Sequence, residues 1–407
     1  MTPSRLYVQT PSGLSGCLDK SAAYDFTYDL GAGPDAAVSL TMPVRSKSYS
    51  RESLHPVFQM NLPEGFLLER LRQQLSKSSG TDPMLLLALL GGEAAIGRLR
   101  FALPGGAPVA GASTSTPAPG ERLSDLLSYR GAHGLFDSLI DRYLMRSGLS
   151  GVQPKVLVPE QPTAKASMMV SDFIVKSGLG DFPGLAINEF VCMTIAARCG
   201  IRTPEFFLSD DRKLFVMRRF DRAADGRALG FEDMAAIAGK DASQKYDGSY
   251  ENIAKLVSAF ASPQHVGAAL AQLFDMVALS CMLGNGDAHL KNFGLLYDDF
   301  DHVTLSPAFD IVNTTCYIPQ DSLALSLGGN RTLFASRQGL LDFAPRCNLT
   351  QAQAGQRIRH MIEVANVVMR EHAELVGEVP NLEGAMHLGL GQFASSFKLS
   401  SPGTRQG

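Results

Sequence analysis

Hydrophobic and polar positions along the first hundred residues predict a small sheet with a few helices. The segments 5–10, 25–31 and 36–43 alternate apolar and polar side chains between turn residues, as antiparallel strands do. An amphipathic run over 62–80 predicts a helix that ends near Gly80. Asp82 and Pro83 then predict the start of a short helix. The run 95–103 returns to a strand pattern, so this part is interpreted as an α+β packing or docking unit.

The rest of the chain changes from strand-rich to helix-rich. Helical patterns cover 135–148 and 186–200, and strand patterns cover 155–158, 171–178 and 213–222. Helices are predicted over 250–260 and 266–284, a short strand and turn over 303–309, and a long helix over 351–378. This order is typical of a two-lobed phosphotransferase and differs from that of alternating βαβ units.

A Pro-, Gly-, Ala-, Ser- and Thr-rich segment at 104–121 has no apolar period and is interpreted as a linker. The predicted organisation is an N-terminal docking domain at 1–103, the linker, a kinase-like N-lobe at 122–220 and a mainly helical C-lobe at 221–407. The fold class is therefore α+β.

Composition narrows the class of protein further. With 37 basic and 40 acidic residues the net charge is −3, so no global attraction to DNA or to an anionic membrane is expected. Six scattered cysteines form no CxxC pair, which favours free thiols in a reducing compartment over disulfides or zinc. No apolar segment resembles a signal peptide or is long enough to span a bilayer, so a cytoplasmic location is expected.

The polar cluster "GNGDAHLKNFG" follows an apolar run and carries the candidate chemistry. Asp287 and Asn292 have the spacing of a protein-kinase catalytic loop, in which Asp is the base and Asn binds a metal ion. Lys291 could neutralise a transferring phosphate. Asp310, in "SPAFD", stands where such kinases place a second metal ligand, and two carboxylates with one amide suit Mg²⁺. The alternative for Asp310 is a role in a turn or as a helix cap.

Other candidates are weaker when each is taken alone. Lys176 ends an apolar strand, as the phosphate-pairing lysine of kinases does, although an exposed strand-end lysine looks the same. Glu189 is either its ion-pair partner or a solvated helix residue. The turn before Lys155 could cover phosphates with its backbone N–H groups, or be only a turn. His289 has no second ligand at metal spacing, so a structural hydrogen bond or a nucleotide contact is favoured over zinc.

Several motifs in order resemble the HipA-type serine/threonine kinases, toxins of type II toxin–antitoxin systems. They are "LPEG", "SGVQPK", "NEF", "FVMRRFDR", "EDM", "KYDGSYENI", "GNGDAHLKNFGLL" and "SPAFDIVN", and they span nearly the whole chain.

The resemblance implies ATP and Mg²⁺ as cofactors and assigns roles to particular residues. Asp287 is the expected proton acceptor, Asn292 and Asp310 are the expected metal ligands, and Lys176 is expected to contact the ATP phosphates. The remaining expected nucleotide contacts are a turn made of Ser150, Gly151, Val152, Gln153, Pro154 and Lys155, a hinge made of Met217, Arg218, Arg219 and Phe220, and the group His289, Lys291 and Phe309.

The resemblance also implies a HipB-like helix-turn-helix antitoxin that carries the contact with operator DNA, and a protein substrate in the aminoacyl-tRNA synthetase class. Family members autophosphorylate a serine three residues before the motif glycine, but Gly148 stands there in this chain. Ser150 and Ser147 are the nearby alternatives. Two other functions stay open: a small-molecule phosphotransferase, and a non-catalytic corepressor bound to the antitoxin.

Overall fold

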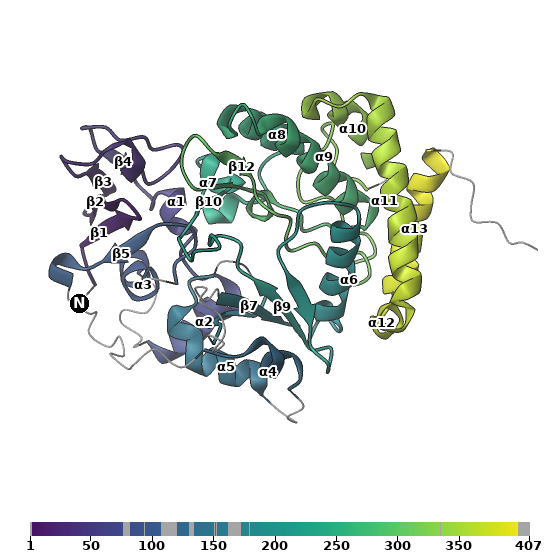
Figure 1. Cartoon of the computed structure of the whole chain (residues 1–407), viewed down its shortest axis with the longest axis horizontal. Helices are drawn as coiled ribbons and strands as arrows, with labels where there is room; N and C mark the ends of the chain where they lie inside the picture. The colour runs from purple at the N-terminus through teal and green to yellow at the C-terminus, as the bar shows by residue number, and fades with distance from the viewer. Residues whose placement is uncertain are drawn as a thin grey trace, which may run out of the picture. The chain divides into compact units, whose positions relative to one another are not determined.

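The computed structural model describes residues 2–75, 82–92, 94–106, 120–129, 134–149, 151, 153–161, 172–178, 180–333 and 335–397. Within these residues the chain forms two compact units. Unit 1 consists of 1–177, 209–244 and 294–303, and unit 2 consists of 178–208, 245–293 and 304–407. Both contain helices and strands (Figure 1), which confirms the predicted α+β class. The predicted linker falls mostly outside the described residues.

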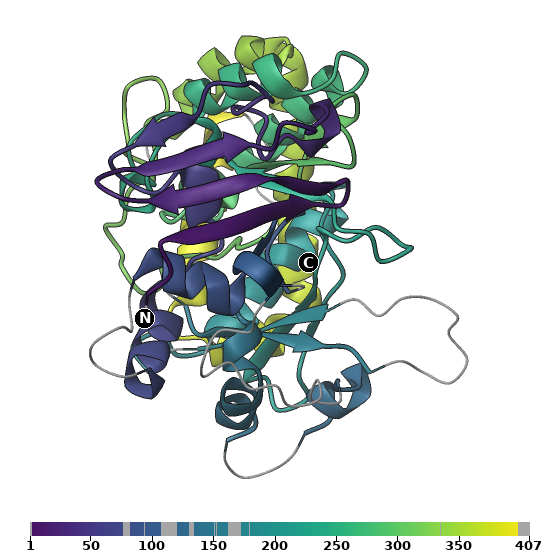
Figure 2. The same cartoon turned by 90° about the vertical axis from the view of Figure 1, so that its left-hand side faces the viewer.

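Unit 1 begins with a five-stranded antiparallel sheet in the order β4-β3-β2-β1-β5. Figure 2 shows its purple strands side by side. A buried apolar cluster that includes Leu6, Phe26, Phe58 and Phe101 joins this sheet to its short helices. The elements are β1 Arg5–Thr10, β2 Gly13–Lys20, β3 Tyr24–Tyr28, β4 Tyr49–Arg51, α1 Pro56–Gln59, α2 Gly65–Gln74, α3 Pro83–Leu90 and β5 Arg100–Ala102.

The start of α3 forms as the sequence predicts. The Asp82 carboxylate accepts hydrogen bonds from the backbone N–H groups of Met84 and Leu85, which have no partner within the helix. The Lys20 ammonium lies 2.6 Å from the same carboxylate.

The strand predicted over 36–43 is wrong. The chain makes a 3-10 turn at Pro34–Ala36 instead. The polar groups after this turn bond to side chains and not to a neighbouring strand. The Ser39 hydroxyl and the N–H of Leu40 donate to the Glu232 carboxylate, and the N–H of Val38 donates to the Tyr28 hydroxyl. Conversely, β2 was not predicted, since its small residues hide the alternation. Gly16 is required there, as a Cβ would lie 2.1 Å from the Thr27 carbonyl oxygen.

A second antiparallel sheet of unit 1 has β6, β7 and β9 as neighbours, and a third pairing joins β10 to β11. The strands predicted over 155–158, 171–178 and 213–222 are present as β6, β7 and β9, with slightly different ends. The remaining elements of unit 1 are α4 Leu123–Leu127, α5 Leu135–Tyr143, the 3-10 turn η3 Leu144–Arg146, β6 Lys155–Pro159, β7 Asp172–Ser177, β9 Leu214–Arg218, β10 Gly230–Asp233, α7 Met234–Ile237 and β11 Gly294–Tyr297.

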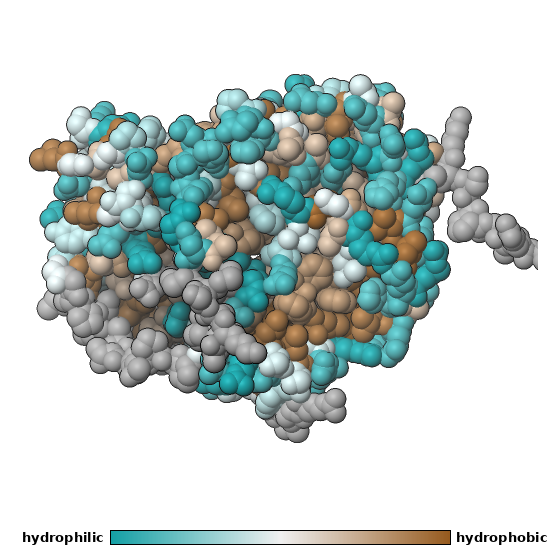
Figure 3. Space-filling view, in the orientation of Figure 1, coloured by the Kyte–Doolittle hydropathy of each residue, from teal (hydrophilic) through white to brown (hydrophobic). Residues whose placement is uncertain are grey.

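Unit 2 is mainly helical, and the long helix α11 packs against α6, α9 and α13. A capping box of Thr350 and Gln353 starts α11, and Ile358, Met361 and Ala365 lie on its buried face. Hydrophilic residues predominate over α11 and α13 at the right-hand edge of Figure 3. The elements are α6 Leu185–Arg198, β8 Phe206–Leu208, α8 Tyr250–Phe260, α9 Val266–Met282, the 3-10 turn η5 Leu290–Asn292, α10 Ser336–Phe343, α11 Gln351–Glu371, α12 Ala373–Glu378 and α13 Leu382–Ser396, with β12 Val303–Leu305 at the boundary of the units.

Two predictions for unit 2 are corrected in detail. The long helix over 351–378 is two helices, because the backbone leaves the helical conformation at His372, with φ −109° and ψ 27°. The helix α13 was not predicted at all. All six cysteines are free in the structure, and Cys192, Cys281, Cys316 and Cys347 are buried. In the described part of the chain, no helix is both long and apolar enough to cross a membrane.

Candidate phosphotransfer site

The polar loop that carries Asp287 begins where the buried helix α9 ends. Gly284 has φ +68°, a conformation that favours glycine, and a Cβ there would lie 2.5 Å from the Thr315 hydroxyl. The next residue, Asn285, is buried, and its side-chain oxygen accepts a hydrogen bond of 3.0 Å from the N–H of Asp287. Asn285 thus shapes the turn that presents Asp287. No role for this asparagine was predicted from its position in the motif.

Asp287 itself reaches the surface, with 52% of its side chain exposed. Its Oδ1 accepts a hydrogen bond of 2.7 Å from the Tyr246 hydroxyl. Tyr246 was not among the predicted site residues, although it lies in the quoted motif "KYDGSYENI". An exposed carboxylate with a fixed orientation is suited to accept a proton from a substrate hydroxyl.

Asn292 lies at the end of the same loop, and its side chain is buried. It ends the 3-10 turn η5, is 6% exposed, and donates its N–H to the carbonyl of His289 at 3.0 Å. Its side-chain oxygen is buried and has no hydrogen-bond partner among the described residues. A buried polar atom without a partner is costly, and an amide oxygen in this position is of a type that can bind a metal ion.

Asp310 adds a carboxylate to this part of unit 2. Its backbone has φ +56°, an uncommon conformation for a residue with a side chain, which marks a constrained position. Its charge raises the pKa of His289, so the carboxylate lies within electrostatic reach of the loop. Among the described residues no cluster of three or more His, Cys, Asp or Glu could hold a metal ion. One amide and one carboxylate oxygen nevertheless fit Mg²⁺, which takes few protein ligands when phosphate oxygens complete its shell.

Helix α6 holds the segment after Asp310 in place through Asn188, which is fully buried. The Asn188 side chain accepts a hydrogen bond from the N–H of Asn313 and donates one to its carbonyl, both at 2.8 Å. The Asn313 side chain in turn donates to the carbonyl of Leu283, at the end of α9. Asn188, the asparagine of the "NEF" motif, therefore holds the backbone of Asn313 in place. This role was not predicted from the sequence.

His289 is neutral at pH 7. Burial lowers its pKa to about 4, and the charges of Lys245 and Lys291 lower it as well, against the opposing effect of Asp287. Its Nε2 lies 4.0 Å from Asp287 Oδ1, too far for a hydrogen bond. A neutral ring beside the loop suits a packing role, and its edge-on contact with the Tyr246 ring has centroids 5.2 Å apart.

Unit 1 brings two lysines together. Lys155 on β6 and Lys176 on β7 are directly opposite each other in the antiparallel register, so both point to the same face of the sheet. They are 7% and 1% exposed. Gly151 has φ +115°, and a Cβ there would lie 2.7 Å from the Lys155 ammonium. Two like charges side by side suit an anionic ligand such as a phosphate chain.

The turn before β6 is tied to the end of β7. The N–H of Ser177 donates to the carbonyl of Pro154 at 3.0 Å, and the Gln153 side chain donates to the carbonyl of Ser177 at 3.4 Å. Ser150 and Val152 lie outside the described residues. The described part of the predicted turn is thus held next to Lys176 within unit 1.

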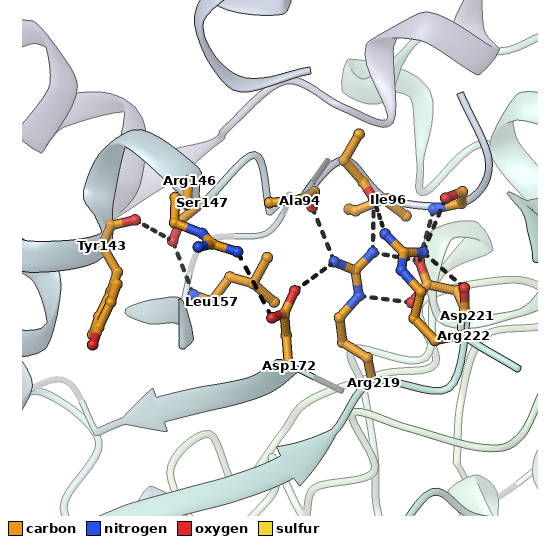
Figure 4. A network of polar contacts seen from close by, with 12 residues as sticks. Ala94, Ile96, Tyr143, Arg146, Ser147, Leu157, Asp172, Arg219, Asp221 and Arg222 are labelled. Carbon is orange, nitrogen blue, oxygen red and sulfur yellow. Dashed lines mark hydrogen bonds and ion pairs between the residues drawn. The ribbon is translucent and has the colours of Figure 1, made fainter. Parts of the chain in front are cut away.

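Ser147 is fully buried, which bears on its expected modification (Figure 4). Its hydroxyl donates to the carbonyl of Tyr143 at 3.0 Å and accepts a hydrogen bond from the N–H of Leu157 at 2.9 Å. In this conformation the hydroxyl is therefore not accessible to a phosphate donor, and transfer to it requires the contact between η3 and β6 to open.

The side chains of the predicted hinge residues are engaged in contacts within unit 1. Arg219 is 5% exposed and donates to Asp221, to Asp172 and to the carbonyls of Ala94 and Ala95 (Figure 4). Arg222 joins the same network through Ala95 and Gly97. The guanidinium charges hold the pKa of Asp221 down at about 2, although burial opposes this.

The other three hinge residues are also engaged. Met217 is buried, Arg218 forms an ion pair with Glu160, and the ring of Phe220 packs edge-on against that of Phe231. A nucleotide beside this segment would therefore meet its backbone, because the long side chains are committed elsewhere.

The structure thus gathers the predicted residues into two groups. Unit 2 brings together Asp287, His289, Lys291 and Asn292 on one loop, with Asp310 and Phe309 on the neighbouring segment. Unit 1 holds Gly151, Gln153, Pro154, Lys155 and Lys176, together with the segment from Met217 to Phe220. Phosphoryl transfer needs a base, metal ligands and cations that bind phosphate, and the two groups contain residue types that could supply them.

Comparison with known proteins then identifies the family. A sequence model of the HipA-like C-terminal domain matches residues 147–369, and a model of the HipA N-terminal domain matches residues 6–102. The chain belongs to the HipA family.

Relatives and a solved structure agree with this assignment. Two Sinorhizobium fredii proteins named "Putative kinase Y4dM" and "Putative kinase Y4mE" are each 28% identical, and the matches cover 76% and 80% of this chain and 74% and 80% of theirs. A Shewanella oneidensis HipA, solved in a complex with HipB and operator DNA, has a TM-score of 0.68 at 17% identity. That match covers 97% of this chain and 96% of the other, so the fold is that of HipA, while the names of the relatives support a kinase.

Proposed function

We propose that the protein is an ATP- and Mg²⁺-dependent serine/threonine protein kinase that acts in the cytoplasm as the toxin of a type II toxin–antitoxin module. The observation that carries the proposal is the loop of unit 2. It presents the exposed carboxylate of Asp287 five residues before the buried Asn292, whose side-chain oxygen has no described hydrogen-bond partner.

In this mechanism Asp287 accepts the proton of a serine or threonine hydroxyl. The hydroxyl oxygen bonds to the γ-phosphorus of ATP, the bond to the β-phosphate oxygen breaks, and ADP leaves. Asn292 and Asp310 would hold Mg²⁺, which supplies positive charge to the phosphates. Lys155 and Lys176 would bind phosphates as cations.

The proposal is tested by label transfer from γ-labelled ATP, with the wild-type chain compared with Asp287→Asn. Removing the base is expected to lower the rate by roughly 100-fold or more. A matched control is Asp342→Asn, an exposed carboxylate on α10 of the same unit, which should leave the rate unchanged. Label in the wild type that persists in Asp287→Asn would show that Asp287 is not the base.

Mass spectrometry of the labelled chain also tests self-modification. Ser150 is the proposed acceptor, because Ser147 is buried and bonded on both sides. A phosphate beside bound ATP would repel it and favour an open turn. Label at Ser147 instead would mean that the contact between η3 and β6 opens during turnover.

The proposed substrate class is the aminoacyl-tRNA synthetases, with the glutamyl enzyme first. A phosphoproteome comparison of cells expressing wild type or Asp287→Asn tests it, and growth arrest should accompany only the active form. Phosphorylated small molecules in place of proteins would favour the alternative of a small-molecule phosphotransferase. Loss of all label transfer, with antitoxin binding retained, would favour the non-catalytic corepressor.

A further inference from the structure

We infer that Tyr246 is a positioning residue that orients the carboxylate of Asp287 for proton transfer, an inference that rests on the proposed kinase function. Both residues lie in unit 2, and the Tyr246 hydroxyl donates a hydrogen bond to Asp287 Oδ1. The hydroxyl hydrogen bond of 2.7 Å has the usual length for an O–H donor and an oxygen acceptor.

A carboxylate on a surface loop can rotate about its side-chain bonds, so its backbone alone does not fix the direction of its oxygens. The Asn285 side chain fixes the N–H of Asp287, and Tyr246 fixes Oδ1. Among the described residues no hydrogen bond reaches the second oxygen, Oδ2. An ionised carboxylate accepts at both oxygens, so Oδ2 can receive the hydroxyl of an acceptor while Tyr246 holds Oδ1.

Tyr246 can act in this way because it is itself anchored. The carbonyl of Tyr246 accepts a hydrogen bond of 2.7 Å from the Arg331 side chain. The carbonyl of the preceding Lys245 accepts one of 3.1 Å from the N–H of Leu290 on the catalytic loop. The segment and the loop are therefore joined by backbone as well as by side chains.

The ring of Tyr246 is held from two sides. His289 packs edge-on at 5.2 Å, and the Lys245 ammonium lies 5.1 Å from the ring centroid. The side chain is still 40% exposed, an open position that a tyrosine kept only for the core would not take.

The test uses the full chain and the variant Tyr246→Phe, which keeps the ring and removes only the hydroxyl. Label transfer at saturating ATP is expected to fall roughly 10-fold, because Asp287 loses its fixed orientation. The ATP concentration at half-maximal rate should stay the same, because the hydroxyl is bonded to Asp287 and is expected to act only through it. The matched control is Tyr49→Phe, which removes a hydrogen bond of 2.7 Å to the carbonyl of Pro43 in unit 1 and should change neither value.

A double-mutant cycle with Asp287→Asn separates positioning from a general effect on the fold. The double variant should be no slower than Asp287→Asn alone, since the hydroxyl acts only through the carboxylate. Equal or faster transfer by Tyr246→Phe, or losses that add in the double variant, would overturn the inference and leave the kinase assignment intact. A wild-type chain that transfers no label would overturn both.

Discussion

At the scale of single residues, buried neutral amides shape the polar segments of the site. Asn285 and Asn188 are each almost fully buried, and each bonds to backbone groups near a candidate catalytic or metal-binding carboxylate. An amide can donate and accept at the same time without carrying a charge into the interior. The positions of the two aspartates are therefore supported by groups that do not titrate.

The buried His55 in unit 1 predicts a dependence of stability on pH. Burial, and then the charge of Arg51, lowers its pKa to about 4, against about 6.5 in an unfolded chain. Between these values the unfolded state binds more protons, so the free energy of unfolding falls as pH drops from 6.5 toward 4. Urea unfolding at pH 7 and pH 5 should show a smaller acid loss for His55→Leu than for wild type.

Comparing wild type with His55→Leu separates the effect of His55 from that of groups that stabilise the folded state as pH falls. Burial raises the pKa of Asp275 to about 6, so that carboxylate favours the folded state as pH falls through the same range. Because Asp275 is present in both proteins, the difference between them reports on position 55. An identical pH dependence for the two proteins would mean that His55 titrates in the folded state as it does in the unfolded chain.

At the scale of elements, helix α6 supports the segment that carries Asp310, because its Asn188 side chain bonds to the backbone of Asn313. Replacing Asn188 by Ala leaves the N–H and carbonyl of Asn313 buried without these partners, which should cost about 2–4 kcal/mol of unfolding free energy. Label transfer should fall as well, since Asp310 loses its support. Denaturant unfolding and the γ-labelled ATP assay measure the two effects.

The control for this variant lies on the same helix. The Thr194 hydroxyl bonds only to the carbonyl of Phe190, one turn earlier in α6. Thr194→Ala should therefore change stability by less than about 1 kcal/mol and leave transfer unaffected. If Asn188→Ala were as mild as this control, the Asn188–Asn313 contact would not be what holds the segment.

Sequence patterns predicted the elements that are marked by apolar runs, such as α8, α9 and the strands that carry Lys176 and Met217. They failed where long-range polar contacts decide the conformation, as at 36–43, where Glu232 binds the backbone. The spacing of Asp287 and Asn292 was readable because both lie on one loop. Tyr246 and Asn188 are 41 and 125 residues from their partners, and no local pattern encodes such contacts.

At the scale of the whole molecule, the net charge predicts that the chain alone binds DNA weakly. A net charge of −3 gives little counterion release on a duplex, so the chain alone should not shift operator DNA at physiological salt. We propose that a HipB-like helix-turn-helix partner supplies that surface. A mobility-shift assay with the chain alone, the partner alone and both together should show a further shift only in the mixture. A shift by the chain alone would place a DNA-binding surface on this protein.

The cysteines of this chain make it suited to site-specific labelling. Burial raises the pKa of Cys281 and Cys199 to about 12 and that of Cys316 to about 11, so these thiols stay protonated at neutral pH and react slowly with maleimides. A cysteine introduced at an exposed position such as Asp342 would react first. Once the half-buried Cys17 is replaced, a fluorophore attached at position 342 could report on unit 2 during turnover.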